Sequence, residues 1–554
     1  MNYGSLPQRE PVDQLFSNTI SDQQSSDNNQ IIQNNIKGWY FYCFSSEPFI
    51  VSVVSTYIPL LLEQFARING VTVVDHSKPC MNSSEHCVVP LFNHRIFVDT
   101  SSFPLYTFSL SVLIQTVVVI TVSGIVDQWN SIKLKGNILV IFSIVGSFST
   151  YTISRLNNTR IYSLPALYIV ANSCFGVINV VGNSMLPVFV TKSIQNDKSV
   201  AHAPNKSVLQ DKLTNVISGR GASLGYLSAL LVQIISMFLI NGSRSKQDIQ
   251  LAIAFVGIWW IMWQSPMFWL FQDMPLTYFR NIGTENIVTS SVDTSLLRTS
   301  QLDTNREYVL NKHTNWGIFS YGWISLWESF KHARLLKDVM IFLISWFIIS
   351  DSTTTINSTA VLFSKTELNM TTLNLITISI LTMINAMIGA YIIPQFLSKR
   401  FSLPPKRILI FIICWTCVIP FYGILGFLFQ NIGLKHKLEM YMLAIWYGLS
   451  LGGLAAVSRS VFSLIIPRGK ESTFFSLFSI TDKGSSILGP FLIGLITDRT
   501  HNIRYAFYLL FTLLMFSLPF LEMLNIDRGK IEAEQLSLLN PPISTTDGQI
   551  SNIP

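Results

Sequence analysis

Ionisable side chains interrupt several segments of this sequence that are otherwise apolar enough to cross a bilayer. Glu47 follows the aromatic run GWYFYCFSS and precedes Pro48, whose ring removes a backbone donor and can open a helix locally. A charge at membrane depth is costly, so such a residue is a functional candidate by default. Glu47 could take up and release a proton or hold the ammonium group of a substrate. It could also lie near the interface and reach water.

A second candidate, Arg220, stands between glycines in SGRGASLGYLSALL. Gly219, Gly221 and Gly225 would let a neighbouring backbone approach closely. The guanidinium could pair with a carboxylate as a gate or bind a substrate carboxylate. It could equally anchor the segment at the membrane interface.

Four further polar residues lie within apolar segments. Asp482 and Lys483, in FFSLFSITDKGSSILGP, are expected near mid-membrane depth. Adjacent residues point about 100° apart on a helix, so these two need not pair with each other, and either could serve transport or pair with another helix. Asp351 is a site residue or a group at the far end of its segment. Asn183, in GNSMLPVF, could line a central path or join helices.

These residues need a membrane-embedded scaffold to position them, and the composition predicts one. Hydrophobic residues make up 49% of the 554 residues and charged residues 12%, about half the charge of a soluble protein. About twelve runs have the length of a bilayer span, roughly 20 mostly apolar residues. The runs lie near 39–62, 104–126, 137–153, 163–190, 220–240, 250–272, 338–361, 372–394, 407–430, 439–465, 473–497 and 505–525. The sequence therefore predicts an all-α polytopic membrane protein.

The longest polar interruption, 273–337, falls between the sixth and seventh runs. Six helices, a long loop and six more helices form the plan of the major facilitator fold, in which two six-helix halves surround a central path. We expect the halves at 38–272 and 338–525 and read 273–337 as a cytosolic loop. Residues 1–37 and 526–554 are expected to be cytosolic tails, the first of them disordered.

Asp127 follows the second run in SGIVDQWNSIKLKG. A glycine, an acid and then basic residues in a tight turn loosely match the gating loop of major facilitator proteins. The eleventh helix is expected to start on the same side, where a carboxylate could meet the positive end of its dipole. The corresponding loop of the second half, QFLSKRFSLPPKR, has no acid, so the match is one-sided.

Charge and glycosylation patterns predict the orientation. Lys and Arg favour the side of the two termini, which the positive-inside rule places in the cytosol. The net charge of +7 therefore reflects topology and does not indicate a nucleic-acid partner. Four glycosylation sequons fall on the far side, at Asn82, Asn157, Asn241 and Asn369. Asn205 falls on the cytosolic side, and Asn357 lies at the far end of a span.

Cysteine and motif patterns give little sign of chemistry. Cys80 and Cys87 lie in the first far-side loop, where an oxidising lumen could join them in a disulfide. Cys414 and Cys417 form a C-x-x-C inside an apolar segment without a second ligand pair, which favours packing over zinc or redox chemistry. A phosphate-binding GxxxxGK[ST] and a metal-binding HExxH are both absent from the sequence. We therefore expect no enzyme, cofactor or metal, and transport driven by a gradient.

Three long stretches carry a family resemblance. SSEPFIVSVVSTYIPLLLEQFARINGV, SGRGASLGYLSALL and IPRGKESTFFSLFSITDKGSSILGPFLIGLITDRTHNIRYAF resemble the fungal autophagy-related protein 22 family of the major facilitator superfamily. The resemblance covers essentially the whole chain apart from its tails. It implies a vacuolar membrane protein that exports amino acids, leucine among them, released when autophagic cargo is degraded. It supplies no binding residues, and a proton as coupling ion is our own hypothesis.

The C-terminal tail carries EQLSLL, in which Glu534 precedes Leu538 and Leu539 as in an acidic dileucine sorting pattern, so a sorting adaptor is a candidate partner. Two other functions stay open. The chain could be a non-transporting membrane scaffold of the autophagy pathway, or a factor that acts on the membranes of autophagic bodies. Charges such as Glu47 and Asp482 favour transport, because a scaffold gains nothing from their cost.

The orientation yields a direct test. Where glycans are present, we expect them at Asn82, Asn157 or Asn241 and not at Asn205, because acceptors must face the lumen. Glycopeptide mass spectrometry of the purified protein measures this occupancy. A glycan on Asn205 would overturn the proposed orientation.

Overall fold

Long helices account for most of the chain in the structure, which is a computed structural model. It describes residues 12–72, 78–80, 87–91, 96–100, 103–129, 131–157, 161–196, 206–239, 246–273, 323–324, 327, 336–368, 370, 372–429, 432–485, 488–489, 492–493, 496, 500 and 503–539. Among these residues, 11 helices are long and apolar enough to cross a membrane. The prediction of an all-α membrane fold is confirmed.

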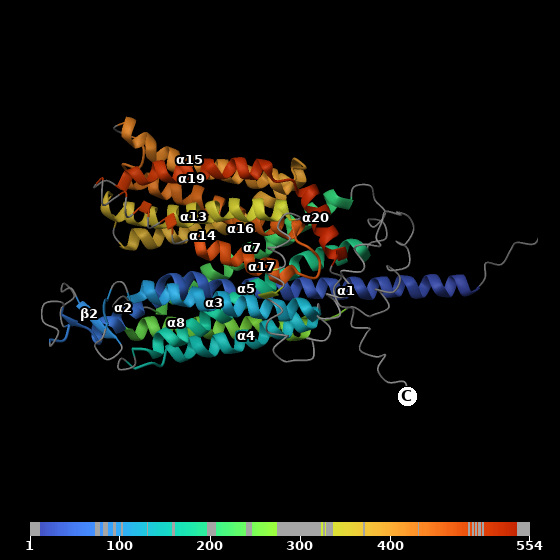
Figure 1. The fold of residues 1–554 in the computed structure, drawn as a ribbon, viewed down its shortest axis with the longest axis horizontal. Helices are drawn as coiled ribbons and strands as arrows, with labels where there is room; N and C mark the ends of the chain where they lie inside the picture. Colours follow the sequence, from blue (N-terminus) through green and yellow to red (C-terminus); the bar gives the residue numbers. More distant parts are fainter. Residues whose placement is uncertain are drawn as a thin grey trace, which may run out of the picture.

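The helices form two halves. The N-terminal half contains α1 (Val12–Pro48), η1 (Phe49–Tyr57), α2 (Ile58–Ile68), α3 (Phe103–Trp129), α4 (Ile132–Ile153), α5 (Ser163–Asn196), α7 (Lys206–Leu239), α8 (Lys246–Gln264) and α9 (Met267–Leu270). The C-terminal half contains α13 (Lys337–Thr366), α14 (Thr372–Arg400), α15 (Pro405–Leu428), α16 (Lys437–Ile465), α17 (Glu471–Ser485), η2 (Ile503–Tyr505), α19 (Ala506–Met523) and α20 (Ile526–Leu539). In Figure 1 the C-terminal half lies above the N-terminal half. Between the halves, α7 packs against α14 and α16, and α3 and α5 pack against α17.

The two ends of the bundle differ in structure. At one end, β1 (Val71–Thr72), β2 (Cys87–Leu91) and β3 (Ile96–Asp99) form a three-stranded antiparallel sheet in the order β1-β2-β3. Figure 1 shows this sheet and α2 at the end opposite α20. We call the two ends the sheet end and the α20 end.

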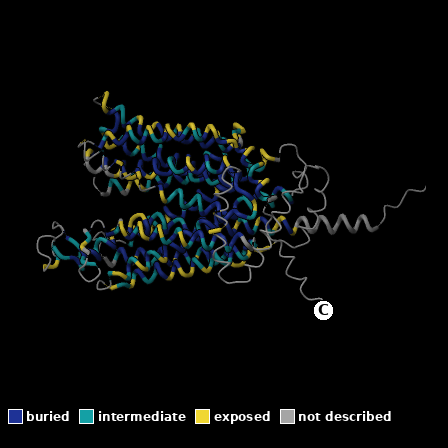
Figure 2. Tube along the Cα trace, in the orientation of Figure 1, coloured by how far each residue is buried: buried dark blue, intermediate teal, exposed yellow. Residues whose placement is uncertain are grey.

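The outer surface has the apolar character that a bilayer requires. Figure 2 shows exposed residues along the outer faces of both halves. Many of them are large and apolar, including Phe148, Phe238 and Leu428, which are exposed by 69%, 76% and 75%. A contiguous apolar exterior of this kind would drive aggregation in water and is stable in lipid.

The N-terminal segment differs from the sequence prediction. We expected residues 1–37 to be disordered, but α1 begins at Val12 and its residues 27–37 pack against the bundle, so the prediction is wrong for residues 27–37. Ile32 and Asn35 are buried, and Asn35 exchanges two hydrogen bonds, of 3.0 and 2.9 Å, with the backbone of Gln272. These tertiary contacts stabilise a helix that the polar local composition does not indicate. Residues 1–11 lie outside the described residues.

Other predicted segments are present in part. The run predicted at 473–497 corresponds to α17, which the structure describes continuously as far as Ser485. Most of the central loop predicted at 273–337 lies outside the described residues. Within the predicted C-terminal tail, α20 is a helix that packs against α13 and α16.

The first span changes its helical type directly after Pro48. α1 ends at this proline, and nine residues, Phe49–Tyr57, form the π-helix η1 before α2 begins. Proline lacks the N–H group that would bond to the preceding turn, and this loosens the α-helical pattern. π-Helical segments are frequent at functional sites, and Glu47 stands immediately before this one.

In the C-terminal half, α14 and α16 pack at backbone distance. A Cβ added to Gly452 of α16 would collide with the backbone oxygen of Ala386 in α14. One turn earlier, Gly448 faces the backbone oxygen of Thr382 in the same way. Small residues permit this close approach, which in a membrane supplies much of the packing energy between helices.

This packing predicts the effect of one methyl group. Gly452→Ala should destabilise the protein by about 1–3 kcal/mol, because the α14 backbone must move to admit the new Cβ. Thermal unfolding of the purified protein in detergent measures the change. Gly484→Ala is the matched control, since a Cβ at Gly484 meets no atom within 4 Å. Equal melting temperatures for the two variants would contradict the prediction.

Candidate functional site

Asp127, in the last turn of α3, joins the two halves at the α20 end. Its buried carboxylate accepts hydrogen bonds from the backbone nitrogens of Ser472, at 2.9 Å, and Thr473, at 2.7 Å, in the first turn of α17. A carboxylate at this place satisfies unpaired N–H groups and meets the positive end of the helix dipole. This is the contact that the sequence around Asp127 suggested. Because α3 and α17 belong to different halves, the bonds close the bundle at this end.

Further hydrogen bonds join the halves nearby. Ser472 Oγ donates to Ser184 Oγ of α5 at 3.0 Å, and Ser218 Oγ of α7 donates to the carbonyl of Ala456 in α16 at 2.7 Å. Lys530 of α20 also reaches α7. These three contacts between the halves lie toward the α20 end.

Charged side chains surround the Asp127 cap. Lys135, from the basic stretch after Asp127, is only 1% exposed, and its Nζ has no hydrogen-bond partner among the described residues. Lys135 and Glu471 both lie close enough to act electrostatically on Asp127. Lys192 and Asp273 extend the group along the N-terminal half. The cap is therefore an acid inside a network of alternating charges.

Glu47 lies farther along the interface, about 18 Å along α1 from Asn35 at 1.5 Å per residue. Its side chain packs on Gly225 of α7, where an added Cβ would lie 3.4 Å from Glu47 Cγ. Arg459 of α16 and Lys483 of α17 are the cations that act on its carboxylate. In the described part of the chain, no cationic nitrogen lies within 4.0 Å of it. Opposite charges from the two halves thus face each other without a direct ion pair.

Aromatic side chains accompany these charges. The guanidinium carbon of Arg459 lies 5.9 Å from the centroid of the Trp39 ring, within cation–π range. The Trp39 indole donates to the carbonyl of Gly182 at 2.8 Å, which fixes the ring on the N-terminal half. Tyr226 of α7 lies near both Glu47 and Arg459. We call Glu47, Arg459, Lys483, Trp39 and Tyr226 the central cluster.

Two of the predicted acidic residues, Asp482 and Asp351, accept hydrogen bonds within the C-terminal half. Asp482 accepts hydrogen bonds from Trp346 Nε1 at 3.1 Å and Ser350 Oγ at 2.7 Å, both on α13. Asp351 accepts from the backbone nitrogen of Gly489 at 2.8 Å. Both carboxylates link α13 to the segment that contains α17, so they stabilise packing within one half.

Arg220 and Asn183 lie outside the central cluster. Arg220 is exposed next to Tyr40 of α1 and, at about 100° per residue, lies on the face of α7 opposite Ser218, which contacts α16. This position favours the interfacial anchor over the gate. Asn183 is buried in α5 and donates to Asn179 at 2.8 Å, while its Oδ1 has no partner among the described residues.

The remaining predicted residues lie away from the central cluster or outside the described residues. A disulfide joins Cys80 and Cys87 at the sheet end, with 6.1 Å between their Cα atoms. Asn157 and Asn357 are exposed, and Glu534 is exposed on α20. The side chains of Leu538 and Leu539 and the sequons at Asn82, Asn205, Asn241 and Asn369 are outside the described residues.

Comparisons with known proteins agree with this architecture. Residues 32–534 match the family model described as vacuole effluxer Atg22 like. The chain belongs to this family. It is 63% identical to autophagy-related protein 22 of Saccharomyces cerevisiae (strain ATCC 204508 / S288c), over 94% of this chain and 98% of that protein. It is 53% identical to the Eremothecium gossypii protein of the same name, over 99% and 100%.

Solved structures place the Atg22-family chain in the major facilitator fold. The proton:xylose symporter XylE matches with a TM-score of 0.57 at 11% identity, over 93% of this chain and 100% of that one. FucP in its outward conformation matches with a TM-score of 0.52 at 12% identity, over 88% and 99%. At such identities the likeness concerns the fold. The chain is a multi-pass membrane transporter and not an enzyme. The letters GASLG at Gly221–Gly225 fit a G-x-S-x-G hydrolase pattern, but they lie inside α7 and form no strand-to-helix turn.

Sequence reasoning missed three members of the central cluster. Arg459 lies in AAVSRSVFS, within the predicted run 439–465, where the sequence indicates no partner for it. Trp39 is one of several aromatics in GWYFYCF, and Tyr226 is a single tyrosine in GYLSALL. An ionisable residue at the centre of an apolar run was a signal for Arg459; for the two aromatics there was none, because only the fold brings them to it.

The cap on α17 predicts a local effect. Asp127→Ala should raise amide hydrogen exchange in the first turn of α17 roughly fivefold, as expected for loss of a cap worth about 1 kcal/mol. Exchange measured by mass spectrometry on the purified protein tests this. Asp273→Ala is the control: Asp273 caps α4 within the N-terminal half, accepting from Ile132 at 2.7 Å, so its loss should raise exchange in α4 and leave the bonds from Ser472 and Thr473 to Asp127 in place. Unchanged exchange in α17 would show that Asp127 does not hold this helix.

Proposed function

We propose that this transporter exports amino acids, leucine among them, from the vacuolar lumen to the cytosol by alternating access of its two halves. The vacuole is the compartment that the family description names. The α20 end is then the cytosolic end, with both termini. The sheet end faces the lumen, where an oxidising environment would favour the Cys80–Cys87 disulfide.

One observation carries the choice of substrate class: the central cluster presents opposite charges from opposite halves. An amino acid is a zwitterion with a carboxylate and an ammonium a few bonds apart. Arg459 is suited to the carboxylate, because a guanidinium presents paired donors in a fixed plane. Glu47, across the interface, is suited to the ammonium. Since the two make no direct ion pair, both remain to be neutralised by a ligand.

The position of the cluster suits alternating access. In the structure the halves are bonded at the α20 end by Asp127 and its neighbours. This arrangement corresponds to a lumen-facing state that loads substrate. A substrate whose two charges touch both halves would favour their closure around it, and release into the cytosol would follow when the Asp127 bonds break.

Glu47 is also our candidate for coupling to protons. The carboxyl group can carry a negative charge or a proton, and in its protonated form its carbonyl oxygen can still accept a hydrogen bond from the substrate ammonium. A proton that loads with the substrate in the acidic lumen and leaves Glu47 at the neutral pH of the cytosol would couple export to the proton gradient. Glu47→Gln keeps the shape of the side chain but fixes it neutral.

The test is uptake of labelled leucine into proteoliposomes under an imposed pH gradient. Arg459→Gln should raise KM for leucine at least about tenfold, since a charged hydrogen bond contributes about 1.5–3 kcal/mol. Glu47→Gln should abolish the response of uptake to the pH gradient. Glu63→Gln is the matched control, because Glu63 pairs with Arg67 on α2, away from the central cluster.

Two outcomes would contradict the proposal. Purified protein that carries no amino acid would favour the scaffold function. Leucine uptake that is unaffected by either substitution would show that the substrate binds elsewhere.

A further inference from the structure

The helix α20 follows the last span and folds back onto the C-terminal half. The residues that recur on its inner face are buried: Ile526, Gly529, Ala533 and Leu536. This face packs on α16 and α13, and Gly529 lies directly against Ile465 and Asp338. The opposite face is polar, with Glu534 and Gln535 exposed.

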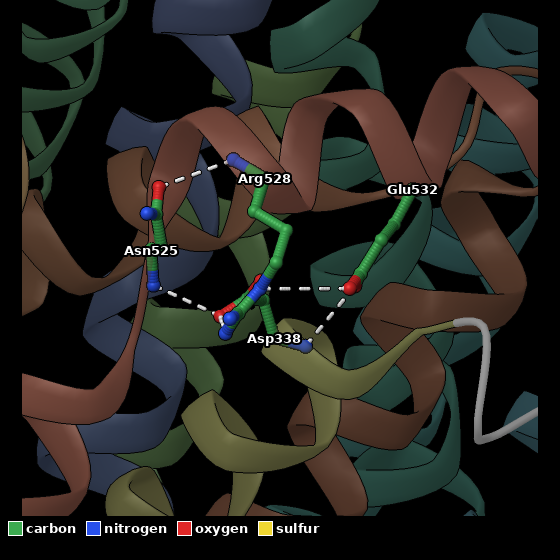
Figure 3. Close-up of polar contacts among 4 residues, drawn as sticks. All are labelled: Asp338, Asn525, Arg528 and Glu532. Atoms are coloured by element: carbon green, nitrogen blue, oxygen red, sulfur yellow. Dashed lines mark hydrogen bonds and ion pairs between the residues drawn. The ribbon is translucent and has the colours of Figure 1, made fainter.

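A buried carboxylate fixes α20 to its own half. Asp338, at the start of α13, is 0% exposed and accepts hydrogen bonds from Arg528 Nε at 2.6 Å and Nη2 at 2.8 Å. It also accepts from the backbone nitrogen of Asn525 at 2.9 Å, and Glu532 accepts from the backbone nitrogen of Asp338 at 3.2 Å (Figure 3). A paired guanidinium and carboxylate with this many bonds has a defined orientation. α20 therefore moves with the C-terminal half.

One residue of α20 reaches the other half. Lys530 Nζ lies 2.7 Å from Asp211 Oδ1 and 2.8 Å from Ser207 Oγ, both in the first turns of α7. The side chains of Lys530 and Asp211 are only 18% and 16% exposed, so this ion pair is partly shielded from water. The Lys530–Asp211 ion pair joins the two halves, whereas the nearby Lys406–Glu522 ion pair lies within the C-terminal half.

We propose that α20 is a latch that holds the α20 end of the transporter closed. Opening this end must separate α7 from α16 and α20. The Arg528–Asp338 pair stays intact in that movement because both residues belong to one half, whereas the Lys530–Asp211 pair must break. The latch and the Asp127 cap both hold the halves together, and each half contributes one of the two side chains. The N-terminal half supplies Asp127 to α17, and the C-terminal half supplies Lys530 to α7.

We expect the latch to change the equilibrium between the open and closed states only modestly. A single partly exposed ion pair changes a two-state equilibrium by a small factor, so the latch shifts the populations of the two states without locking either. Because the measurement below detects only this equilibrium, its outcome is independent of the substrate and coupling ion proposed above.

Distances between spin labels test the latch. Labels are placed on Cys introduced at Lys133 and Arg407, which are exposed at the α20 end of the N- and C-terminal halves, after Cys43, Cys174, Cys414 and Cys417 are replaced by alanine. Double electron–electron resonance on the full chain in lipid nanodiscs then gives the populations of shorter and longer distances. Lys530→Ala should raise the ratio of longer to shorter distances roughly threefold.

A charge swap and a neutral control keep the test decisive. Lys530→Asp should open the end at least as much as Lys530→Ala, and adding Asp211→Lys should restore the parent distribution. Lys337→Ala removes an exposed lysine at the same end that has no partner among the described residues, and it should change nothing. Equal distributions for Lys530→Ala and Lys337→Ala would overturn the proposal. A swap that fails to restore the parent distribution would overturn it as well.

Discussion

The two hydrogen bonds from Ser472 and Thr473 to Asp127 are the contact on which the closed form of the bundle depends. They satisfy backbone donors that would otherwise be unpaired at the start of α17, and they do so with a carboxylate from the other half. A helix end and an acid that need each other thus belong to two bodies that must move apart. Closure is therefore stable but reversible.

Contacts between the two halves differ along the interface. Near the α20 end, hydroxyl, carboxylate and ammonium groups of one half find partners on the other, whereas in the central cluster the opposite charges stop short of pairing. Charges that are held in a membrane without direct partners are costly. A site with this arrangement is suited to a ligand that supplies the missing charges and then leaves.

Much of this architecture could be predicted from the sequence, because hydrophobic length determines a span almost regardless of tertiary context. Asp127 could be placed near the start of α17 for a related reason: alternating spans return to the same side of the membrane. The packed helix at residues 27–37 could not be predicted, since it depends on Asn35 meeting Gln272, more than two hundred residues later.

The partners of individual charged residues also could not be predicted from the sequence. Asp482 and Lys483 are neighbours in the chain, yet the carboxylate turns toward Trp346 and Ser350 and the ammonium acts on Glu47. Arg459 and Trp39 come together from helices of different halves. Adjacent side chains on an α-helix point about 100° apart, and only the packing of the bundle determines which of them faces a partner.

The π-helix η1 has a mechanical consequence for the first span. Each residue of a π-helix turns through a smaller angle than in an α-helix, because its hydrogen bonds reach one residue further. If part of Phe49–Tyr57 changed between the two geometries, α1 would rotate about its own axis relative to α2 while both helices stayed intact. Glu47 lies next to Pro48, directly before η1, so it would rotate with α1. Such a change would turn the carboxylate toward or away from the opposite half by a twist of the first span, without a hinge.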